Sequence, residues 1–474
     1  MSTNLNAHLP RAAFDTLAAD LHGEVALPGS HRYRLPRPWN LAVSTHPVAV
    51  VVAEDVDDVQ HAVRWAAAHD LRVAVHATGH GGVSQGSDVL VIHTGGLQQC
   101  SIDVAQRTAH FGAGVLAEQL LDATHECGLA PVIGSTGTVG VAGYLSGGGI
   151  GPLVSTFGLS SDYIRALEVV TADGVLHHVT AEQNSDLYWA MRGGKGAVGI
   201  ITSVWLELLD LTTVYGGTLH FAAFDAADVM NEWARWSAQL PDQATTSLAL
   251  TNMPRDSSVP APLNGRFVAS VRFATPAGRD EAEVLLADMR RVAAPIVDTI
   301  GPMPYRELAG AYGNPPGPVP VHQDQRLLTA LTPDTVRAIL LAAGPDSGSP
   351  LTEVELRRLG GVFARQPKHS SAFSHRDSPY SLGVTGILAD AASPTVGWAD
   401  RLLSAVDPWS HGATMANFVD TTDPTMIARA YDPATLDRLR QIAEKFDSTG
   451  VFGAAGELQL GRRASMTGQG APAR

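Results

Sequence analysis

Two glycine-rich stretches, residues 76–88 and 134–153, interrupt a series of strand-like and helix-like patterns, and this combination restricts the fold more than any other feature. From residue 48 the chain reads as a strand, an amphipathic helix opened by acidic residues, and a second strand that runs into the first glycine-rich stretch. Such a pattern is typical of α/β or α+β proteins. Glycines after a strand either make tight turns or let backbone N–H groups approach a flat, anionic ligand where a Cβ would collide. The spacing alone leaves both interpretations open.

The stretch "SGGGIG" at residues 146–151 is similar to a dinucleotide-binding turn, which requires a strand before it and a helix after it. Its lead-in, "VGVAGYL", reads as a strand. The segment that follows is broken by Pro152 and Gly158, so no helix of useful length offers its N-terminus to a pyrophosphate. The Rossmann interpretation is therefore disfavoured, and the sequence contains no GK[ST] phosphate-binding loop.

The later part of the chain predicts a second body. A two-strand hairpin is expected within residues 164–179, turning at 172–174. From about residue 213, strand patterns alternate with amphipathic helices at 225–239 and 277–291, which indicates a separate sheet backed by helices. A charged helix is expected at 436–447.

Composition narrows the class of partner. The 474 residues include 47 acidic and 33 basic side chains, a formal charge of −14, so no broad basic surface is available to bind nucleic acid. No apolar run is long enough to span a membrane, and no leader pattern is found, so we expect a cytoplasmic protein with no membrane partner. Cys100 and Cys127 are expected to be buried thiols. We expect no metal site, because His76 and His80 lie on a strand and a glycine turn with no HExxH pattern or carboxylate pair.

Several segments occur in the order expected of a known family. The segments "HPVAVVVAEDVDDV", "RVAVHATGHGGVSQG", "GTVGVAGYLSGGGIGPLVSTFGLSSDYI" and "DLYWAMRGGKGAVGIITSVWLEL" resemble the FAD-linked oxidases of the vanillyl-alcohol oxidase / p-cresol methylhydroxylase superfamily, berberine-bridge-enzyme-like (BBE-like) branch. The match covers about residues 30–212 and returns more weakly near the C-terminus.

The resemblance implies an α+β fold with a two-part FAD-binding PCMH-type domain and a substrate domain whose antiparallel sheet is backed by helices. The expected boundaries are an FAD domain at 1–212 with its core at about 42–212, a substrate domain at 213–412, a BBE-like segment at 413–462 that returns to the FAD domain, and a tail at 463–474.

The resemblance also gives His80 a role. In this family the segment R-x-G-G-H carries a histidine bonded covalently to the flavin, and His80 occupies that position, with His76 where the family has arginine. Many relatives add a cysteinyl link two residues before the T-V-G-V run, where this chain has Thr136, so we expect FAD attached through His80 alone. A histidine in a polar turn is the alternative. Further cofactor contacts are expected from Thr78, Gly79, Gly81, Gly82, Ser84, Thr136, Gly137, Thr138, Gly140, Gly143, Ser146, Gly148, Ile201 and Asn417.

The catalytic base is harder to assign. Oxidases of the family often use a tyrosine two residues before the Asn of Y-x-N-F, and here that residue is Met415. In "TEVELRRLGG", strand alternation places Glu353, Glu355 and Arg357 on one side. Facing the flavin, Glu355 would be a base whose pKa burial raises toward neutrality, whereas a structural ion pair is the alternative. Arg357 is a further catalytic candidate on the same side as Glu355, and other candidates are His375, Arg376, Tyr380 and Tyr305.

The resemblance implies an FAD-dependent oxidase that oxidises a small organic molecule, expected to be a secondary metabolite, with molecular oxygen as acceptor and hydrogen peroxide as product. If no side chain proves to be the base, an acidic phenol or β-dicarbonyl would need little help in losing its proton. Three alternatives stay open: an oxygenase or oxidative cyclase that uses a flavin–oxygen adduct, a dehydrogenase with another acceptor, and a non-catalytic flavin or ligand carrier. Neither the substrate nor the oligomeric state follows from the sequence.

Overall fold

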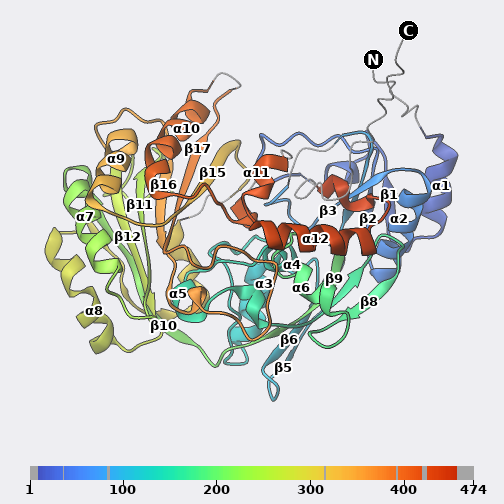
Figure 1. Cartoon of the computed structure of the whole chain (residues 1–474), viewed down its shortest axis with the longest axis horizontal. Coiled ribbons are helices and arrows are strands. Elements are labelled where there is room, and N and C mark those ends of the chain that lie inside the picture. The colour runs from blue at the N-terminus through green and yellow to red at the C-terminus, as the bar shows by residue number, and fades with distance from the viewer. Residues whose placement is uncertain are drawn as a thin grey trace, which may run out of the picture.

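The computed structural model describes residues 9–35, 37–82, 86–313, 317–390, 393–418 and 424–455, and its strands form three sheets (Figure 1). The first has the order β1 (Glu24–Ala26), β2 (Ala49–Val52), β4 (Val89–His93), β3 (Arg72–His76). The second has the order β5 (Cys100–Asp103), β6 (Thr108–Gly112), β9 (Ile200–Glu207), β7 (Ile164–Val170), β8 (Leu176–Val179). The third has the order β13 (Val297–Asp298), β10 (Thr213–Ala222), β12 (Phe267–Thr275), β11 (Thr245–Asn252), β16 (Glu353–Arg358), β17 (Tyr380–Ile387), β15 (Val321–Leu328), with β14 (Gly301–Pro304) also paired to β10.

The first sheet positions the first glycine-rich stretch. Strands β2 and β3 pair in parallel with β4 on either side, and helix α2 (Val56–Ala68) connects β2 to β3. The carboxylate of Asp55 caps this helix by accepting from the backbone N–H of Asp58 at 3.1 Å. Because parallel strands end at the same edge, His76 of β3 lies opposite His93 of β4 in register. The chain enters its glycine-rich turn from this edge.

The second sheet carries the predicted hairpin and one correction. Strands β7 and β8 pair antiparallel from Val170 and Leu176, so the turn expected at 172–174 is confirmed. The expected strand in "VGVAGYL" is wrong, because residues Val141–Ser146 form helix α4. Val141, Ala142 and Leu145 are buried while Gly143 is exposed, which is helical rather than strand periodicity. The break after residue 151 is confirmed, since α5 (Val154–Phe157) has only 4 residues.

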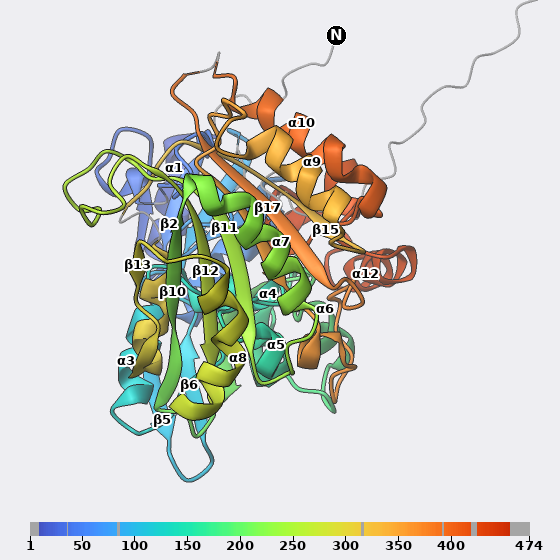
Figure 2. The same ribbon diagram turned by 90° about the vertical axis from the view of Figure 1, so that its left-hand side faces the viewer.

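The third sheet is antiparallel and has two different faces. One face is covered by helices α7 (Ala226–Ser237), α8 (Arg279–Val292), α9 (Pro333–Ala343) and α10 (Thr395–Val406), which lie in front of the strands in Figure 2. Alternate residues of the strands pack against these helices, among them Val354 and Leu356 of β16. The other face looks toward the first two sheets (Figure 1). The predicted α+β class and the helix-backed antiparallel sheet are confirmed.

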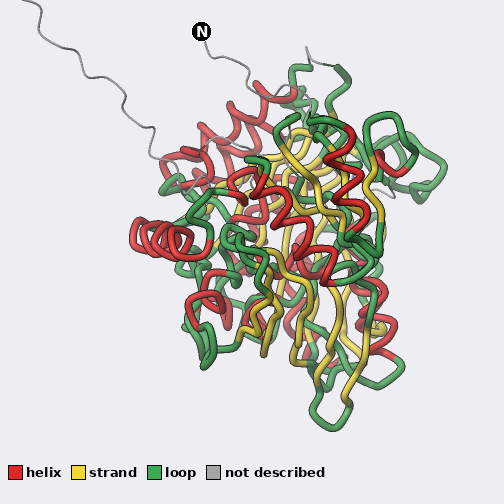
Figure 3. Tube along the Cα trace, turned by 90° about the vertical axis from the view of Figure 1, so that its right-hand side faces the viewer, coloured by secondary structure: helices red, strands yellow, loops and turns green. Residues whose placement is uncertain are grey.

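The remaining α-helices pack around the first two sheets. They are α1 (Arg11–Ala19), α3 (Ala117–His125), α6 (Ser185–Ala190), α11 (Pro424–Ala428) and α12 (Pro433–Phe446). Helix α12, expected from its charge pattern, reaches the hairpin, where the carbonyl of Phe446 accepts from the backbone N–H of Ala172 at 3.2 Å. Seen from the other side, strands run behind an outer set of helices (Figure 3).

Two further expectations bear on the chain as a whole. Across the described segments, no helix combines the length and the apolar character that crossing a bilayer requires. Cys100 is exposed in β5 and Cys127 is half-buried after α3, so the expectation that both thiols are buried is wrong. Cys100 lies in a strand at the edge of its sheet, which exposes it. The domain boundaries expected from the resemblance stay predictions.

Candidate active site

The first glycine-rich turn presents the His80 side chain. The chain leaves β3 at His76 and turns at Gly79, whose φ of +68° lies in the left-handed region that glycine adopts without strain. A Cβ on Gly79 would lie 3.0 Å from Cα of Pro38, so a larger residue would also crowd the preceding segment. Glycine is therefore required here for both conformation and space.

The imidazole of His80 is held on three sides. Its Nδ1 lies 3.0 Å from Oγ1 of Thr78 and its Nε2 lies 3.4 Å from Oγ1 of Thr138. The indole of Trp39 stacks on the ring, with centroids 5.3 Å apart and planes 23° apart. Burial lowers the pKa of His80 to about 4. The imidazole is therefore neutral at physiological pH, with one ring nitrogen able to act as a nucleophile.

The second glycine-rich stretch meets the first at Gly140. Its backbone N–H donates to Oγ1 of Thr78 at 3.3 Å, and a Cβ on Gly140 would lie only 2.9 Å from Cβ of Ala77. Helix α4 begins just after this contact, and the carbonyl of Tyr144 accepts from Nδ2 of Asn417 at 2.9 Å. Four residues of helix span about 6 Å, so the His80 turn and the Asn417 segment lie about one helical turn apart along α4.

The other expected cofactor residues fall into three groups. Thr78, Gly79, Thr138, Gly140 and Asn417 belong to the contacts just described. Gly81, Gly82, Thr136, Gly137 and Gly143 lie in the same two stretches, with Gly143 exposed on α4. Ser146 and Ile201 are buried, Gly148 has a φ of +102° and lies against the ring of Phe373, and Ser84 lies outside the described residues.

The predicted strand alternation at β16 is confirmed. Glu353, Glu355 and Arg357 share the face that the helices do not cover, opposite Val354 and Leu356. Arg357 Nε donates to one oxygen of Glu355 at 2.6 Å.

A second arginine completes this group from another strand. Nη1 of Arg272 in β12 donates to the other oxygen of Glu355 at 2.7 Å, and its Nη2 donates to Glu353 at 2.9 Å. Arg272 reaches Glu355 across β11, where the register places the short side chain of Ser247 between Arg272 and Arg357. These four charged side chains, Arg272, Glu353, Glu355 and Arg357, are called the charged cluster below.

The expectation that the pKa of Glu355 is raised is wrong. Burial by itself raises this pKa, but the charges of Arg357 and Arg272 outweigh burial and hold it below its ordinary value. Glu355 is therefore ionised and already bound by two guanidinium groups. This is the ion pair that the sequence left open as an alternative, and it makes Glu355 a weak proton acceptor.

Two aromatic rings lie between the charged cluster and the segment that contacts α4. The guanidinium carbons of Arg272 and Arg357 lie 4.8 and 5.7 Å from the ring centroid of Tyr312, in the 3₁₀ helix η4 (Tyr305–Tyr312). The guanidinium carbon of Arg357 also lies 5.7 Å from the ring centroid of Phe418, the residue after Asn417. The uncovered face of the third sheet thus meets the segment that holds α4.

The secondary catalytic candidates lie elsewhere. Tyr380 is buried on the helix-covered face, where its hydroxyl lies 3.2 Å from Oγ of Ser237 in α7, so it is not brought to the charged cluster. The hydroxyl of buried Tyr305 donates to the carbonyl of Pro131 at 2.8 Å, which suits a structural role. Both positions depend on the strand register and on tertiary packing, which the local sequence does not show.

His375 and Arg376 belong to the loop between β16 and β17. His375 has a φ of +62° and its ring centroid lies 5.6 Å from that of His411, and burial lowers its pKa. Arg376 makes two hydrogen bonds to the carboxylate of Asp162, at 2.7 and 3.0 Å. These bonds attach the loop to the segment that follows the second glycine-rich stretch. No contact in the described chain joins either residue to the charged cluster.

Met415 is buried where the resemblance leads us to look for a tyrosine. Its side chain packs among apolar residues that include Leu327 and Phe373, and its backbone N–H donates to Oε1 of Gln325 at 3.1 Å. The thioether offers no proton acceptor of useful strength.

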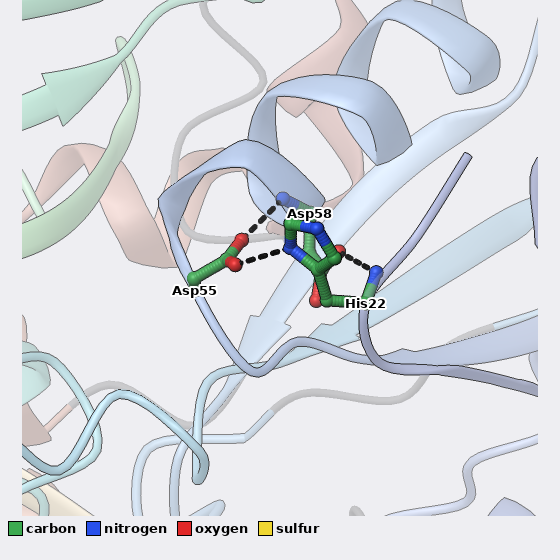
Figure 4. Close-up of side chains that lie close together, drawn as sticks. All are labelled: His22, Asp55 and Asp58. Carbon is green, nitrogen blue, oxygen red and sulfur yellow. Dashed lines mark hydrogen bonds and ion pairs between the residues drawn. The ribbon is translucent and has the colours of Figure 1, made fainter.

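A separate group of His22, Asp55 and Asp58 has ligand atoms within 4.8 Å of one another (Figure 4). The oxygens of Asp58 already accept from the backbone N–H groups of His22, Gly23 and Glu54, and Asp55 caps α2. The group therefore has a structural explanation in the start of a helix.

Sequence reasoning missed four residues of the site: Trp39, Tyr144, Arg272 and Tyr312. Only Arg272 carries a signal, because "RFVASVRFA" alternates and places Ser270 and Arg272 on one face. Trp39, Tyr144 and Tyr312 carry no local signal of a role in the site, and they reach it only through tertiary structure.

Comparison with known proteins agrees with this arrangement. Residues 47–180 match the family described as FAD binding domain. An FAD-linked oxidoreductase of Dictyostelium discoideum is 26% identical, with 91% of this chain and 93% of that protein covered.

Two solved structures share the fold. The wild-type BBE-like 1 protein of Physcomitrella patens has a TM-score of 0.82 at 22% identity, covering 95% of this chain and 100% of that one. A glucooligosaccharide oxidase from Acremonium strictum, described with a 6-S-cysteinyl, 8α-N1-histidyl FAD, has a TM-score of 0.81 at 17% identity with the same coverage. Residues 47–180 are thus similar to the FAD binding domain family, most of the chain is similar to a protein named as an FAD-linked oxidoreductase, and the fold is that of a BBE-like protein.

Proposed function

We propose that this chain is an oxidase that holds FAD covalently through His80 and uses molecular oxygen to oxidise a small organic molecule. Two electrons and two protons leave the substrate, and oxygen takes them up as hydrogen peroxide. The observation that carries this proposal is the neutral imidazole of His80, fixed between two threonine hydroxyls and a stacked indole.

The residues present fit the cofactor. The Gly140 backbone approaches Ala77 so closely that a side chain is excluded, which is the kind of cradle that a flat, anionic dinucleotide needs. Thr78, Thr138, Gly140 and Asn417 would hold FAD next to His80. When bound, FAD supplies an acceptor for the two electrons of the substrate.

A single covalent link follows from Thr136. The oxidase from Acremonium strictum is described with both a cysteinyl and a histidyl bond to FAD. At the position of the second link this chain has a threonine, whose hydroxyl forms no thioether, and Cys127 lies nine residues upstream at the end of α3. The proposed attachment therefore uses His80 alone.

On the substrate side, the charged cluster and Tyr312 offer hydrogen bonds and charge rather than a strong base. Burial raises the pKa of Tyr312, although the two neighbouring arginines oppose this, so its phenol is protonated and donates. Glu355 is ionised and occupied by two arginines. The residues thus orient the substrate and hold charge in place, and the best substrates are those that lose a proton readily on their own.

The test is an absorption spectrum of the purified protein before and after acid precipitation. The expected result is a flavin spectrum whose colour stays in the pellet, and mass analysis should find FAD on the peptide that contains His80. His80→Ala should release the colour into the supernatant, while His178→Ala, at an exposed position of β8, should not. A colourless protein, or FAD attached to another residue, contradicts the proposal.

A separate measurement tests whether molecular oxygen is the electron acceptor. After anaerobic reduction with dithionite, mixing with air should restore the oxidised spectrum within seconds and release hydrogen peroxide. Reoxidation over many minutes, with fast reduction of an added dye, would instead indicate a dehydrogenase. Incorporation of labelled oxygen into a product would indicate an oxygenase.

A further inference from the structure

The guanidinium of Arg357 is only partly used by the protein. Its Nε donates to Glu355, and within the described residues neither Nη atom makes a hydrogen bond to protein. Arg272 differs, because its Nη atoms bind Glu353, Glu355 and the carbonyl of Tyr312. Two donor groups of Arg357 are therefore available for a ligand.

The charges around Arg357 are unevenly compensated. Arg272 faces two carboxylates, whereas Arg357 faces only that of Glu355, which Arg272 shares. The Arg357 side chain is 18% exposed, so it is too deep for bulk water to screen its charge fully and yet open on one side. A planar guanidinium with free Nη groups is suited to bind oxygens of a carboxylate or another organic anion.

The position of Arg357 also suits the binding of a substrate close to the cofactor. The rings of Tyr312 and Phe418 both lie near its guanidinium, each with its centroid 5.7 Å from the guanidinium carbon. Phe418 follows Asn417, which holds the carbonyl of Tyr144 on the helix that begins at the His80 turn. A small aromatic molecule bound to Arg357 would have aromatic neighbours and would lie on the cofactor side of the third sheet.

We propose that Arg357 binds an anionic oxygen of the substrate, and that this chain acts on small organic acids whose acidic O–H proton is one of the two that the oxidation releases: acidic phenols or enols. This deepens the proposed function and rests on it for the oxidation itself. The O–H proton goes to water before binding, so the anion is the form that binds and no side chain has to remove that proton. The absence of a tyrosine at Met415 and the occupied state of Glu355 are then expected features.

The test compares two probes of nearly the same size and shape, benzoate and benzamide, by calorimetric titration of the FAD-loaded protein and by the change in its flavin spectrum. Benzoate should bind at least about tenfold more tightly, which corresponds to about 1.4 kcal/mol. Arg357→Gln should remove this preference, and Arg357→Lys should keep part of it. The control Arg365→Gln, an exposed arginine paired with Asp242, should leave it unchanged.

Loss of Arg357 leaves Glu355 with one partner, so thermal melts of each variant establish that it is folded. The double variant Glu355→Gln/Arg357→Gln removes both charges and should also bind the two probes equally. Equal affinities in the wild-type protein, no binding of benzoate, or a preference that survives in Arg357→Gln would overturn the inference. Calorimetry needs no flavin signal, so a protein without covalent FAD would refute the proposed attachment while this comparison still decides the role of Arg357.

Discussion

The hydroxyl of Thr78 lies 3.0 Å from Nδ1 of His80 and at the same time accepts from the backbone N–H of Gly140 at 3.3 Å. One side chain thus couples the two glycine-rich stretches to the imidazole that would carry the flavin. The geometry of this ring depends on that hydroxyl, because a hydrogen bond to one nitrogen determines which way the other is presented.

We therefore expect Thr78→Val to slow covalent attachment of FAD by about five- to tenfold, the equivalent of one hydrogen bond of about 1 kcal/mol. The measurement is the fraction of flavin that stays with the protein after acid precipitation, followed over time with added FAD. Thr78→Ser keeps the hydroxyl and should attach at the wild-type rate. Equal rates for the serine and valine variants would show that the hydroxyl of Thr78 does not influence covalent attachment.

Gly140→Ala should lower both FAD content and stability. The new Cβ would lie 2.9 Å from Cβ of Ala77, so the two stretches must separate, at a cost of about 1–3 kcal/mol. Gly397 is the matched control, because it lies exposed in α10 with no atom within 4 Å of a new Cβ. Gly397→Ala should raise stability by about 0.5–1 kcal/mol, as helix propensity predicts. Chemical denaturation compares the two, and a harmless Gly140→Ala would show that the contact is loose.

Removal of the Glu355 charge should destabilise the third sheet. Glu355→Gln leaves Arg272 and Arg357 without their shared carboxylate in a buried setting, which costs about 3 kcal/mol. Glu353 pairs with one arginine, Arg272, and its side chain is 30% exposed, so Glu353→Gln should cost less than about 1 kcal/mol. Urea unfolding of both variants measures the difference. Similar losses would mean that Glu355 is not the centre of the charged cluster.

Acid should destabilise the protein through His76. Burial and the neighbouring His93 lower the pKa of His76 to about 4, against about 6.5 in the unfolded chain. The unfolded state therefore binds more protons between these values, so stability is fully present above pH 6.5 and falls as the pH drops toward 4. The change is on the order of 3 kcal/mol.

The free energy of unfolding, measured from pH 4 to 8, tests this dependence. His76→Gln should make the profile below pH 6.5 less steep without flattening it, because burial also lowers the pKa of His80 and of His220 to about 4. An unchanged profile in that variant would assign the acid sensitivity to other groups.

Part of this site is readable in the sequence because it depends on local rules. The hairpin at 172–174 follows from a turn signal, and the common face of Glu353, Glu355 and Arg357 follows from the twofold repeat of a strand. A tight turn was one of the two interpretations that the sequence left open for these glycines, and Gly79 makes such a turn with a positive φ.

The rest depends on which strands become neighbours. Arg272 lies more than 80 residues from Glu355 and reaches it only because β11, with a serine at the crossing point, lies between them. The sequence near Glu355 does not indicate that Arg272 will contact it. The sequence therefore predicts a raised pKa for Glu355, whereas the two arginines lower it. Tyr380 ended on the helix side for a similar reason, since its register partner is Arg358 rather than Arg357.

The third sheet has one consequence for how this protein can change. Its helix-covered side carries the packing, while alternate positions such as Ser247, Glu355 and Ser381 point the other way. The residues that pack against the helices and the residues of the uncovered face therefore alternate along the same strands. A library that varies only every second codon of β11, β16 and β17 would explore new chemistry while it leaves the apolar layer intact.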